Sequence, residues 1–159
     1  MKKIFVAMAA VSTLAFAGHA SAQSFVGSSG TVTGALELQQ TLTLPCTLNA
    51  LTINVVSPSV AYTAFPYLPY DFCSGVSAVN SNSDWTITAI SSTQIAIYIP
   101  HVNAVAGTCG AGTVIATKVA NGPPQQFRID RQSIPGKVGF INWNCWISGD
   151  IFVSGVSLT

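Results

Sequence analysis

Residues 31–44 have the sequence TVTGALELQQTLTL, and this stretch decides the fold class. Its even positions are mostly apolar and its odd positions mostly polar. A period of two is typical of a β-strand with one buried face. Because 14 residues are long for one strand, we expect a bend near Gln39-Gln40. The apolar face makes four leucines candidates for contact with another copy of the chain: Leu36, Leu38, Leu42 and Leu44.

The alternation changes phase after Pro45. Leu51, Ile53 and Val55 are apolar and alternate with polar residues, so their odd numbering is opposite to that of the first stretch. Residues 48–50 are therefore predicted to form a turn between two strands.

Six more segments have the pattern or composition of strands. They are residues 85–89, 95–99, 113–119, 127–129, 138–147 and 151–158, with Ser148-Gly149-Asp150 expected as a hairpin turn between the last two. No helical period extends over eleven residues. About eight strands predict an all-β fold, a single antiparallel β-sandwich or small barrel spanning residues 23–159.

The N-terminus has the pattern of a secretory signal peptide over residues 1–22. Lys2 and Lys3 precede an apolar stretch at residues 4–17, and Ala20-Ser21-Ala22 is a small-residue cleavage site. The apolar stretch is shorter than the roughly 20 residues of a membrane span. We expect a secreted protein that passes through the periplasm and acts outside the cell or on its surface.

Charge is scarce and balanced. Only 7% of residues are charged, against about 25% in ordinary soluble domains. Removal of Lys2 and Lys3 with the signal leaves four Lys and Arg against five Asp and Glu, a net charge of −1. Nucleic acid is therefore excluded as an expected partner, and little repulsion keeps copies of the chain apart.

Four cysteines, Cys46, Cys73, Cys109 and Cys145, predict two disulfides in an exported chain. Three pairings are possible. We favour Cys73–Cys109 with Cys46–Cys145.

The sequence offers little catalytic chemistry. His101 is the one histidine left after cleavage, and there is no G-x-S-x-G motif. The cysteines are too widely spaced for a zinc site, and the scattered acids match no calcium loop. We expect no enzyme, no metal and no cofactor.

Two aromatic tracts are candidates for contact with a partner. The first is Pro58–Phe72, which contains Tyr62, Phe65, Tyr67 and Tyr70; it is either an exposed contact loop or a cover over the core, and we favour the cover. The second is Asn142–Trp146. There we expect Trp143 to pack in the core beside a disulfide, while Trp146 points to the other face as core or as a contact between subunits.

Four motifs in a short exported chain resemble the bacterial alkane-oxidation activator proteins of the Pra type. They are Cys46 after the alternating strand, Cys73-Ser-Gly, Trp85-Thr-Ile-Thr-Ala and Cys109-Gly-Ala-Gly-Thr-Val. The resemblance covers about residues 31–119 and implies a non-enzymatic role at the cell surface, in adhesion, biofilm or growth on hydrocarbons. It transfers no catalytic residue, and both aromatic tracts depart from the family pattern.

These observations favour a self-associating structural or adhesive protein, with a filament subunit that pairs through a strand edge as its specific form. One alternative is a chaperone–usher-like pilin that donates the strand at residues 31–44. Another is a module that binds carbohydrate or hydrocarbon through Tyr62, Tyr67, Tyr70 and Trp146. An outer-membrane barrel is disfavoured because paired aromatic girdles are absent.

Overall fold

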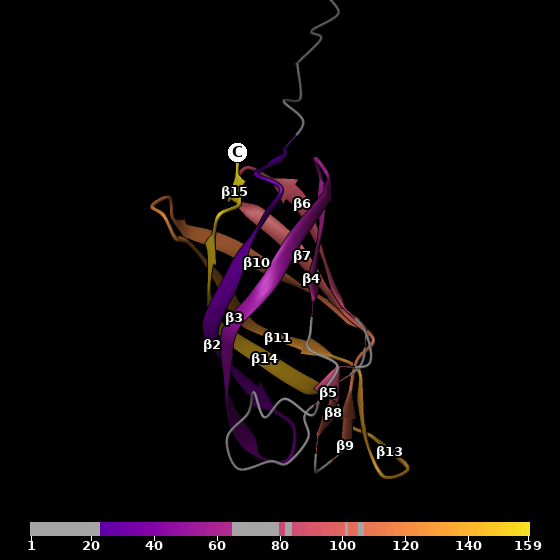
Figure 1. The fold of residues 1–159 in the computed structure, drawn as a ribbon. Coiled ribbons are helices and arrows are strands. Elements are labelled where there is room, and N and C mark those ends of the chain that lie inside the picture. The colour runs from indigo at the N-terminus through magenta and orange to yellow at the C-terminus, as the bar shows by residue number, and fades with distance from the viewer. Residues whose placement is uncertain (1–22, 65–79, 82–83, 101, 105–106) are drawn as a thin grey trace, which may run out of the picture.

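Eight strands close into an antiparallel barrel in the computed structural model, which describes residues 23–64, 80–81, 84–100, 102–104 and 107–159 (Figure 1). The order around the barrel is β10-β11-β14-β2-β3-β4-β6-β7, and β7 pairs with β10 to complete the circle. The strands are β2 (Ser29–Gln39), β3 (Thr43–Ser57), β4 (Val60–Ala64), β6 (Trp85–Ser91), β7 (Gln94–Ile99), β10 (Gly112–Ala120), β11 (Gln125–Ile134) and β14 (Cys145–Ser154). The all-β prediction is confirmed, as a barrel rather than a sandwich.

Two smaller sheets lie at opposite ends of the barrel (Figure 1). One, the end ribbon, pairs β1 (Phe25–Val26) with β15 (Ser157–Leu158). The other, the end sheet, has the order β13-β12-β9-β8-β5. Its strands are β5 (Asn80–Ser81), β8 (Val102–Ala104), β9 (Gly107–Cys109), β12 (Gly136–Val138) and β13 (Ile141–Asn142).

Inward-facing side chains fill the barrel. Alternate residues of each strand are buried, among them Leu36, Ile97 and Phe127, because an eight-stranded barrel is just wide enough for side chains to fill its interior. Two spaces between these side chains measure only about 10 and 20 Å³. The volume of one water molecule is similar, so these spaces hold no organic ligand.

The bend expected near Gln39-Gln40 is a hairpin turn. β2 ends at Gln39 and β3 begins at Thr43. The turn predicted at residues 48–50 is wrong, because β3 runs through it. Leu48 pairs with Gly34 and Leu51 with Val32, so two residues of β3 lie opposite one of β2. This β-bulge shifts the alternation by one residue, which produced the change of phase in the sequence.

The hairpin turn predicted at Ser148-Gly149-Asp150 is also wrong, because β14 continues through it to Ser154. Gly149 has φ +134°, and a Cβ added there would lie 2.3 Å from the Ala35 carbonyl oxygen of β2. The glycine therefore allows two barrel strands to approach closely rather than ending a strand.

The aromatic tract at residues 58–72 includes an unpredicted strand, β4, at Val60–Ala64. β4 pairs with both β3 and β6. The remainder of the tract, from residue 65 onward, lies outside the described residues. The strands predicted at 85–89, 95–99 and 113–119 are confirmed as β6, β7 and β10.

Both favoured disulfide pairings are wrong, because Cys109 is bonded to Cys145. Cys46 is also disulfide-bonded, and its partner lies outside the described residues. Cys109 ends β9 and Cys145 begins β14, so the bond joins the end sheet to the barrel wall. Strand order in space brings these cysteines together, and the sequence does not reveal that order.

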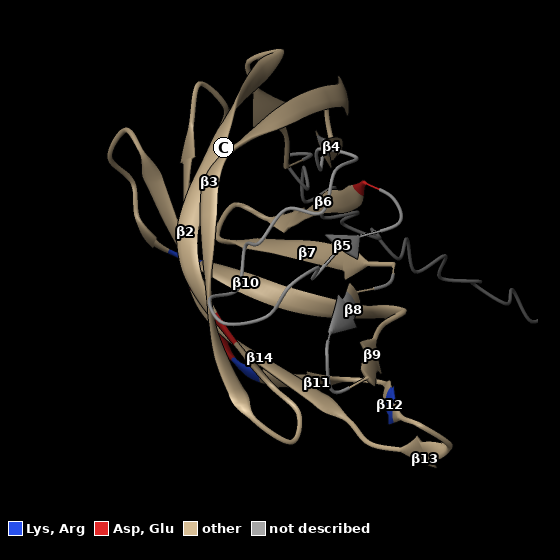
Figure 2. Ribbon diagram, turned by 60° about the horizontal axis from the view of Figure 1, so that its bottom comes forward, with Lys and Arg blue, Asp and Glu red and all other residues tan. Residues whose placement is uncertain are grey.

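Few charged residues lie on the barrel (Figure 2). Arg128 on β11 and Asp150 on β14 lie at paired positions and form a salt bridge. Among the described residues, no helix has the length and apolar composition needed to cross a membrane.

Candidate interaction surface

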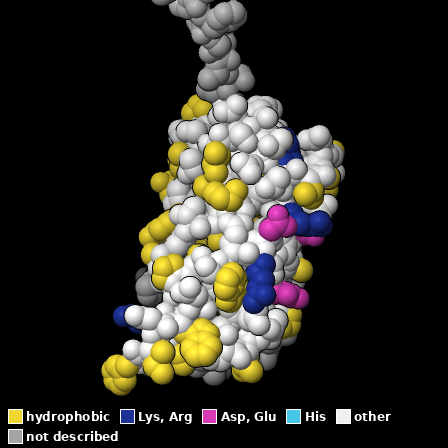
Figure 3. Space-filling model, turned by 180° about the vertical axis from the view of Figure 1, so that it is seen from behind, with side chains coloured by type: hydrophobic (Ala, Val, Ile, Leu, Met, Phe, Trp, Pro, Cys, Tyr) yellow, Lys and Arg dark blue, Asp and Glu magenta, His cyan; other side chains and the backbone are white. Residues whose placement is uncertain are grey.

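Large apolar side chains are exposed at the end of the barrel that carries the end sheet. Hydrophobic atoms are visible at this end of the surface (Figure 3). We call the set the apolar end cluster: Leu42 (67% exposed), Phe140 (107%), Ile141 (63%), Trp143 (49%) and Trp146 (37%). A soluble protein rarely exposes large apolar side chains in a group unless they contact something.

The most exposed member lies at the tip of a hairpin. Val138 and Ile141 pair as β12 turns into β13, and Gly139 takes φ +56° in the turn. This backbone conformation favours glycine. Phe140 follows it with its side chain fully in solvent. The hairpin thus presents a convex apolar tip rather than a pocket.

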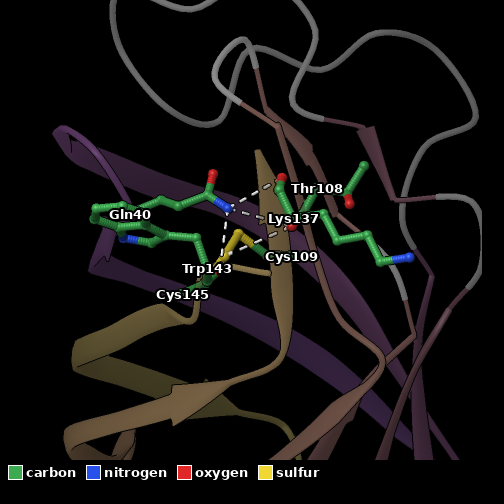
Figure 4. The surroundings of a disulfide bond; sticks show 6 residues. All are labelled: Gln40, Thr108, Cys109, Lys137, Trp143 and Cys145. Carbon is green, nitrogen blue, oxygen red and sulfur yellow. Dashed lines mark hydrogen bonds between the residues drawn. A yellow bond between two sulfur atoms is a disulfide. The ribbon is translucent and has the colours of Figure 1, made fainter. Parts of the chain in front are cut away.

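One glutamine holds the β2–β3 turn against the end sheet (Figure 4). The Gln40 Nε2 donates toward three backbone carbonyl oxygens: Lys137 at 3.2 Å, Trp143 at 3.3 Å and Thr108 at 3.5 Å. Its Oε1 is buried, and no described group donates to it. Since these carbonyls belong to three separate segments, the single amide sets the position of Leu42 relative to the hairpin.

The Cys109–Cys145 disulfide lies directly beneath this contact (Figure 4). Both cysteines are fully buried. Gly136 packs so closely against Cys145 that an added Cβ would lie 2.7 Å from its sulfur and 2.5 Å from the Trp143 carbonyl oxygen. The apolar end cluster is therefore attached to a rigid base.

Trp146 lies at the edge of the cluster, on the outer face of β14. The Arg131 guanidinium stacks 4.7 Å from the centre of the Trp146 ring and donates a hydrogen bond to the Gln39 Oε1 at 2.7 Å. A cation over an indole face is attracted by the ring quadrupole. Arg131 thereby fixes the Trp146 ring while the ring remains 37% exposed.

The opposite end of the barrel has a recess instead of a projection. A groove of about 410 Å³ lies between the β10–β11 loop, the β14–β15 turn and β1. Val153 and Val156 are buried in its lining, and Val26 stands in its wall 54% exposed. We call this recess the ribbon groove; the remaining lining is Gly27, Asn121, Gly122, Pro123, Gln125, Ser154, Gly155 and Ser157.

A buried glutamine maintains the ribbon groove. The Gln125 Oε1 accepts from the Leu158 N–H at 2.8 Å, and its Nε2 donates to the Leu158 carbonyl at 3.3 Å. The amide thus satisfies the outer edge of β15 as a neighbouring strand would. The Lys118 Nζ donates to the same carbonyl at 3.0 Å.

A pair of tyrosines lies on the side of the barrel. Thr86 of β6 is paired with Tyr62 of β4 on one side and with Tyr98 of β7 on the other. Tyr62 is 39% and Tyr98 42% exposed. Two strand spacings separate the tyrosines by about 10 Å.

The Arg128–Asp150 ion pair lies on the wall away from both ends. Its N–O distance is 2.9 Å, and the side chains are 52% and 32% exposed. The hydrogen bond from Arg128 lowers the pKa of Asp150, and the same bond raises the pKa of Arg128.

The leucines predicted for contact with a partner lie in three settings. Leu36 and Leu38 are 4% and 6% exposed and form part of the core, which corrects their predicted role. Leu44 is half-buried against the core, and only Leu42 is strongly exposed. Both edges of β2 are paired, with β14 and with β3, so neither edge is available to another chain in this structure.

The aromatic candidates are only partly described. Tyr62 and Trp146 are exposed, while Phe65, Tyr67, Tyr70, Cys73 and His101 lie outside the described residues. Trp143 is 49% exposed, so its predicted place in the core is wrong. The single strand predicted at residues 138–147 is wrong, because a turn at Gly139 interrupts it and exposes Phe140 and Ile141. Gly139 is the sequence signal for this turn. No cluster of metal-ligating side chains occurs among the described residues.

A family model described as alkane oxidation protein activator PraA/PraB-like matches residues 1–157 of the chain. Searches of curated proteins and of solved structures found no match.

Proposed function

The chain belongs to the PraA/PraB-like family of alkane oxidation protein activators, and on this basis we propose that it is an exported, non-enzymatic adhesive protein. In this proposal it attaches to apolar surfaces and to copies of itself through the apolar end cluster. The signal-peptide pattern at residues 1–22 and the Cys109–Cys145 disulfide support an oxidising compartment outside the cytoplasm.

The exposure of Phe140 at the hairpin tip carries the proposal. A phenylalanine that is 107% exposed receives no stabilisation from the fold, and its contact with water is unfavourable. Transfer of such a side chain from water to an apolar phase is worth about 1.5–3 kcal/mol. With its neighbours Ile141 and Trp143, the tip is suited to enter a hydrocarbon–water interface.

Adsorption to hexadecane droplets tests this role. We expect Phe140→Asp to lower the amount of mature protein bound to the droplets by about tenfold or more, because one buried aromatic side chain is lost. Ile90→Asp is the matched control, since Ile90 is 46% exposed at a site outside the cluster. Equal adsorption of Phe140→Asp and Ile90→Asp, with both folded by circular dichroism, would contradict the proposal.

A second candidate function is carbohydrate binding on the wall of the barrel. Tyr62 and Tyr98 flank the Thr86 hydroxyl on one row, and aromatic rings with a polar group between them suit the faces and hydroxyls of sugar rings. Replacing both tyrosines with Ala should abolish retention of the protein on a polysaccharide column. Unchanged retention would exclude this wall as the binding site.

A further inference from the structure

The two ends of the barrel differ in shape in a way that concerns how copies of the chain meet. One end projects the hairpin tip with Phe140 and Ile141, and the other contains the ribbon groove. Figure 1 shows β13 of the tip and β15 of the groove at opposite ends of the molecule. We infer that the tip of one copy inserts into the ribbon groove of the next.

The groove has room for such a tip. Its volume of about 410 Å³ exceeds what a phenylalanine side chain fills. Val26 in the groove wall is 54% exposed and would be covered by the incoming ring, while Val153 and Val156 lie buried beneath it. Each contact would thus bury apolar groups from both partners, which is the main favourable contribution to association.

Charge does not oppose this contact. None of the residues lining the groove is charged, and none of the five members of the apolar end cluster is charged. Lys137 lies at the base of the tip hairpin, paired with Asn142, and faces no cation in the groove lining. The two surfaces therefore meet without like-charge repulsion.

The symmetry of this contact determines the assembly. A contact between two different surfaces at opposite ends of a molecule is heterologous, and it leaves one tip and one groove free after every addition. Copies therefore add head to tail into an open chain whose free tip remains available to an apolar surface. This inference depends on the self-association part of the proposed function and identifies its two surfaces.

The test uses two variants that each disable one surface. Phe140→Asp removes the tip, and Val26→Asp places a charge in the groove wall. Both side chains are exposed, so neither change disturbs the core. Ile90→Asp and Val119→Asp are matched controls, at 46% and 47% exposure outside both surfaces.

Sedimentation velocity of the mature protein over a range of concentrations gives the readout. We expect the wild type and both controls to form a concentration-dependent series of oligomers. Phe140→Asp and Val26→Asp alone should stay monomeric to at least about tenfold higher concentration. Mixed together they should form a species of two chains and no larger one, since the mixture contains one intact tip and one intact groove per pair.

Three results would overturn the inference. They are a monomeric wild type, association of Val26→Asp equal to that of the wild type, and a mixture that contains only monomers. The second result would indicate contact between tips. Because adsorption to hexadecane depends only on the tip, it would still report on the proposed attachment if the head-to-tail contact failed.

A second groove variant controls for the possibility that the charge in Val26→Asp disturbs the end ribbon itself. Gly122 lines the groove, and a Cβ added there would meet no atom within 4 Å. Gly122→Arg should therefore fold normally and block insertion by occupying the groove. Its failure to weaken association by about tenfold would also count against the inference.

Discussion

The two ends of the barrel are closed by small sheets, yet they are held in different ways. The end sheet is bonded covalently to the wall through Cys109–Cys145. The Gln40 side chain also donates toward two carbonyl oxygens within this sheet and one next to it. The end ribbon has no cysteine and depends on backbone pairing and on Gln125. The end with the exposed apolar tip is therefore also the end with the covalent anchor.

Removing that anchor should have the largest effect. In the variant with Cys109→Ser and Cys145→Ser, we expect the free energy of unfolding to fall by about 2–5 kcal/mol in urea denaturation. Amide exchange should increase in β9 and β12, where the bond holds the end sheet, and should remain native in β1 and β15. Equal loss of protection at both ends would show that the two ends are not anchored separately.

Replacing the glutamine at each end, Gln40 or Gln125, should lower the free energy of unfolding by an intermediate amount. Gln125→Leu leaves the buried Leu158 N–H without its acceptor, so we expect a loss of about 1–3 kcal/mol in the free energy of unfolding. Gln40→Leu removes contacts that are mostly exposed and should cost less, about 0.5–1.5 kcal/mol. Urea denaturation of both variants checks the order, and a larger loss for Gln40→Leu would contradict this account.

We expect the smallest effect on stability from the Arg128–Asp150 ion pair on the wall between the two ends. Because the Arg128 hydrogen bond lowers the pKa of Asp150, the stabilisation from this pair is present above the ordinary carboxyl pKa of about 3.9. It is lost as the pH falls through the lowered pKa in the folded state. Exposure to solvent keeps it small.

Thermal unfolding of the wild type and of Asp150→Asn, measured from about pH 2 to about pH 6, reports the contribution of this ion pair to stability. At the upper end of this pH range we expect Asp150→Asn to unfold at a slightly lower temperature than the wild type. At the acid end the two unfolding temperatures should become equal. A difference in unfolding temperature that grows as the pH falls would contradict the prediction.

Local sequence patterns predicted most of the barrel strands. A strand with one buried face has apolar and polar residues that alternate along the sequence, and this alternation is easily recognised. The pattern failed where the barrel requires a local irregularity. The bulge opposite β2 shifted the phase, and Gly149 resembled a turn although it serves a close approach of strands. Such features depend on neighbouring strands that are distant in sequence.

The candidate surface was harder to predict than the fold. Trp146 was identified because it alternates with Cys145 and Ile147, which are buried. Phe140 was not predicted, and Trp143 was wrongly predicted to lie in the core, because a short hairpin interrupts the alternation before β14. The ribbon groove has no signature in the sequence, since segments near residues 26, 122 and 155 form it only after the barrel closes.

Hydroxyl-radical footprinting of a chain that begins at Gln23, free and adsorbed on hexadecane, tests the central claim most directly. Aromatic side chains at both the tip and the wall are exposed and therefore report on their contacts. We predict that adsorption protects Phe140 and Trp143 from oxidation and leaves Tyr98 unchanged. Protection of Tyr98 with continued oxidation of Phe140 would place the contact on the wall and contradict a role for the apolar end cluster.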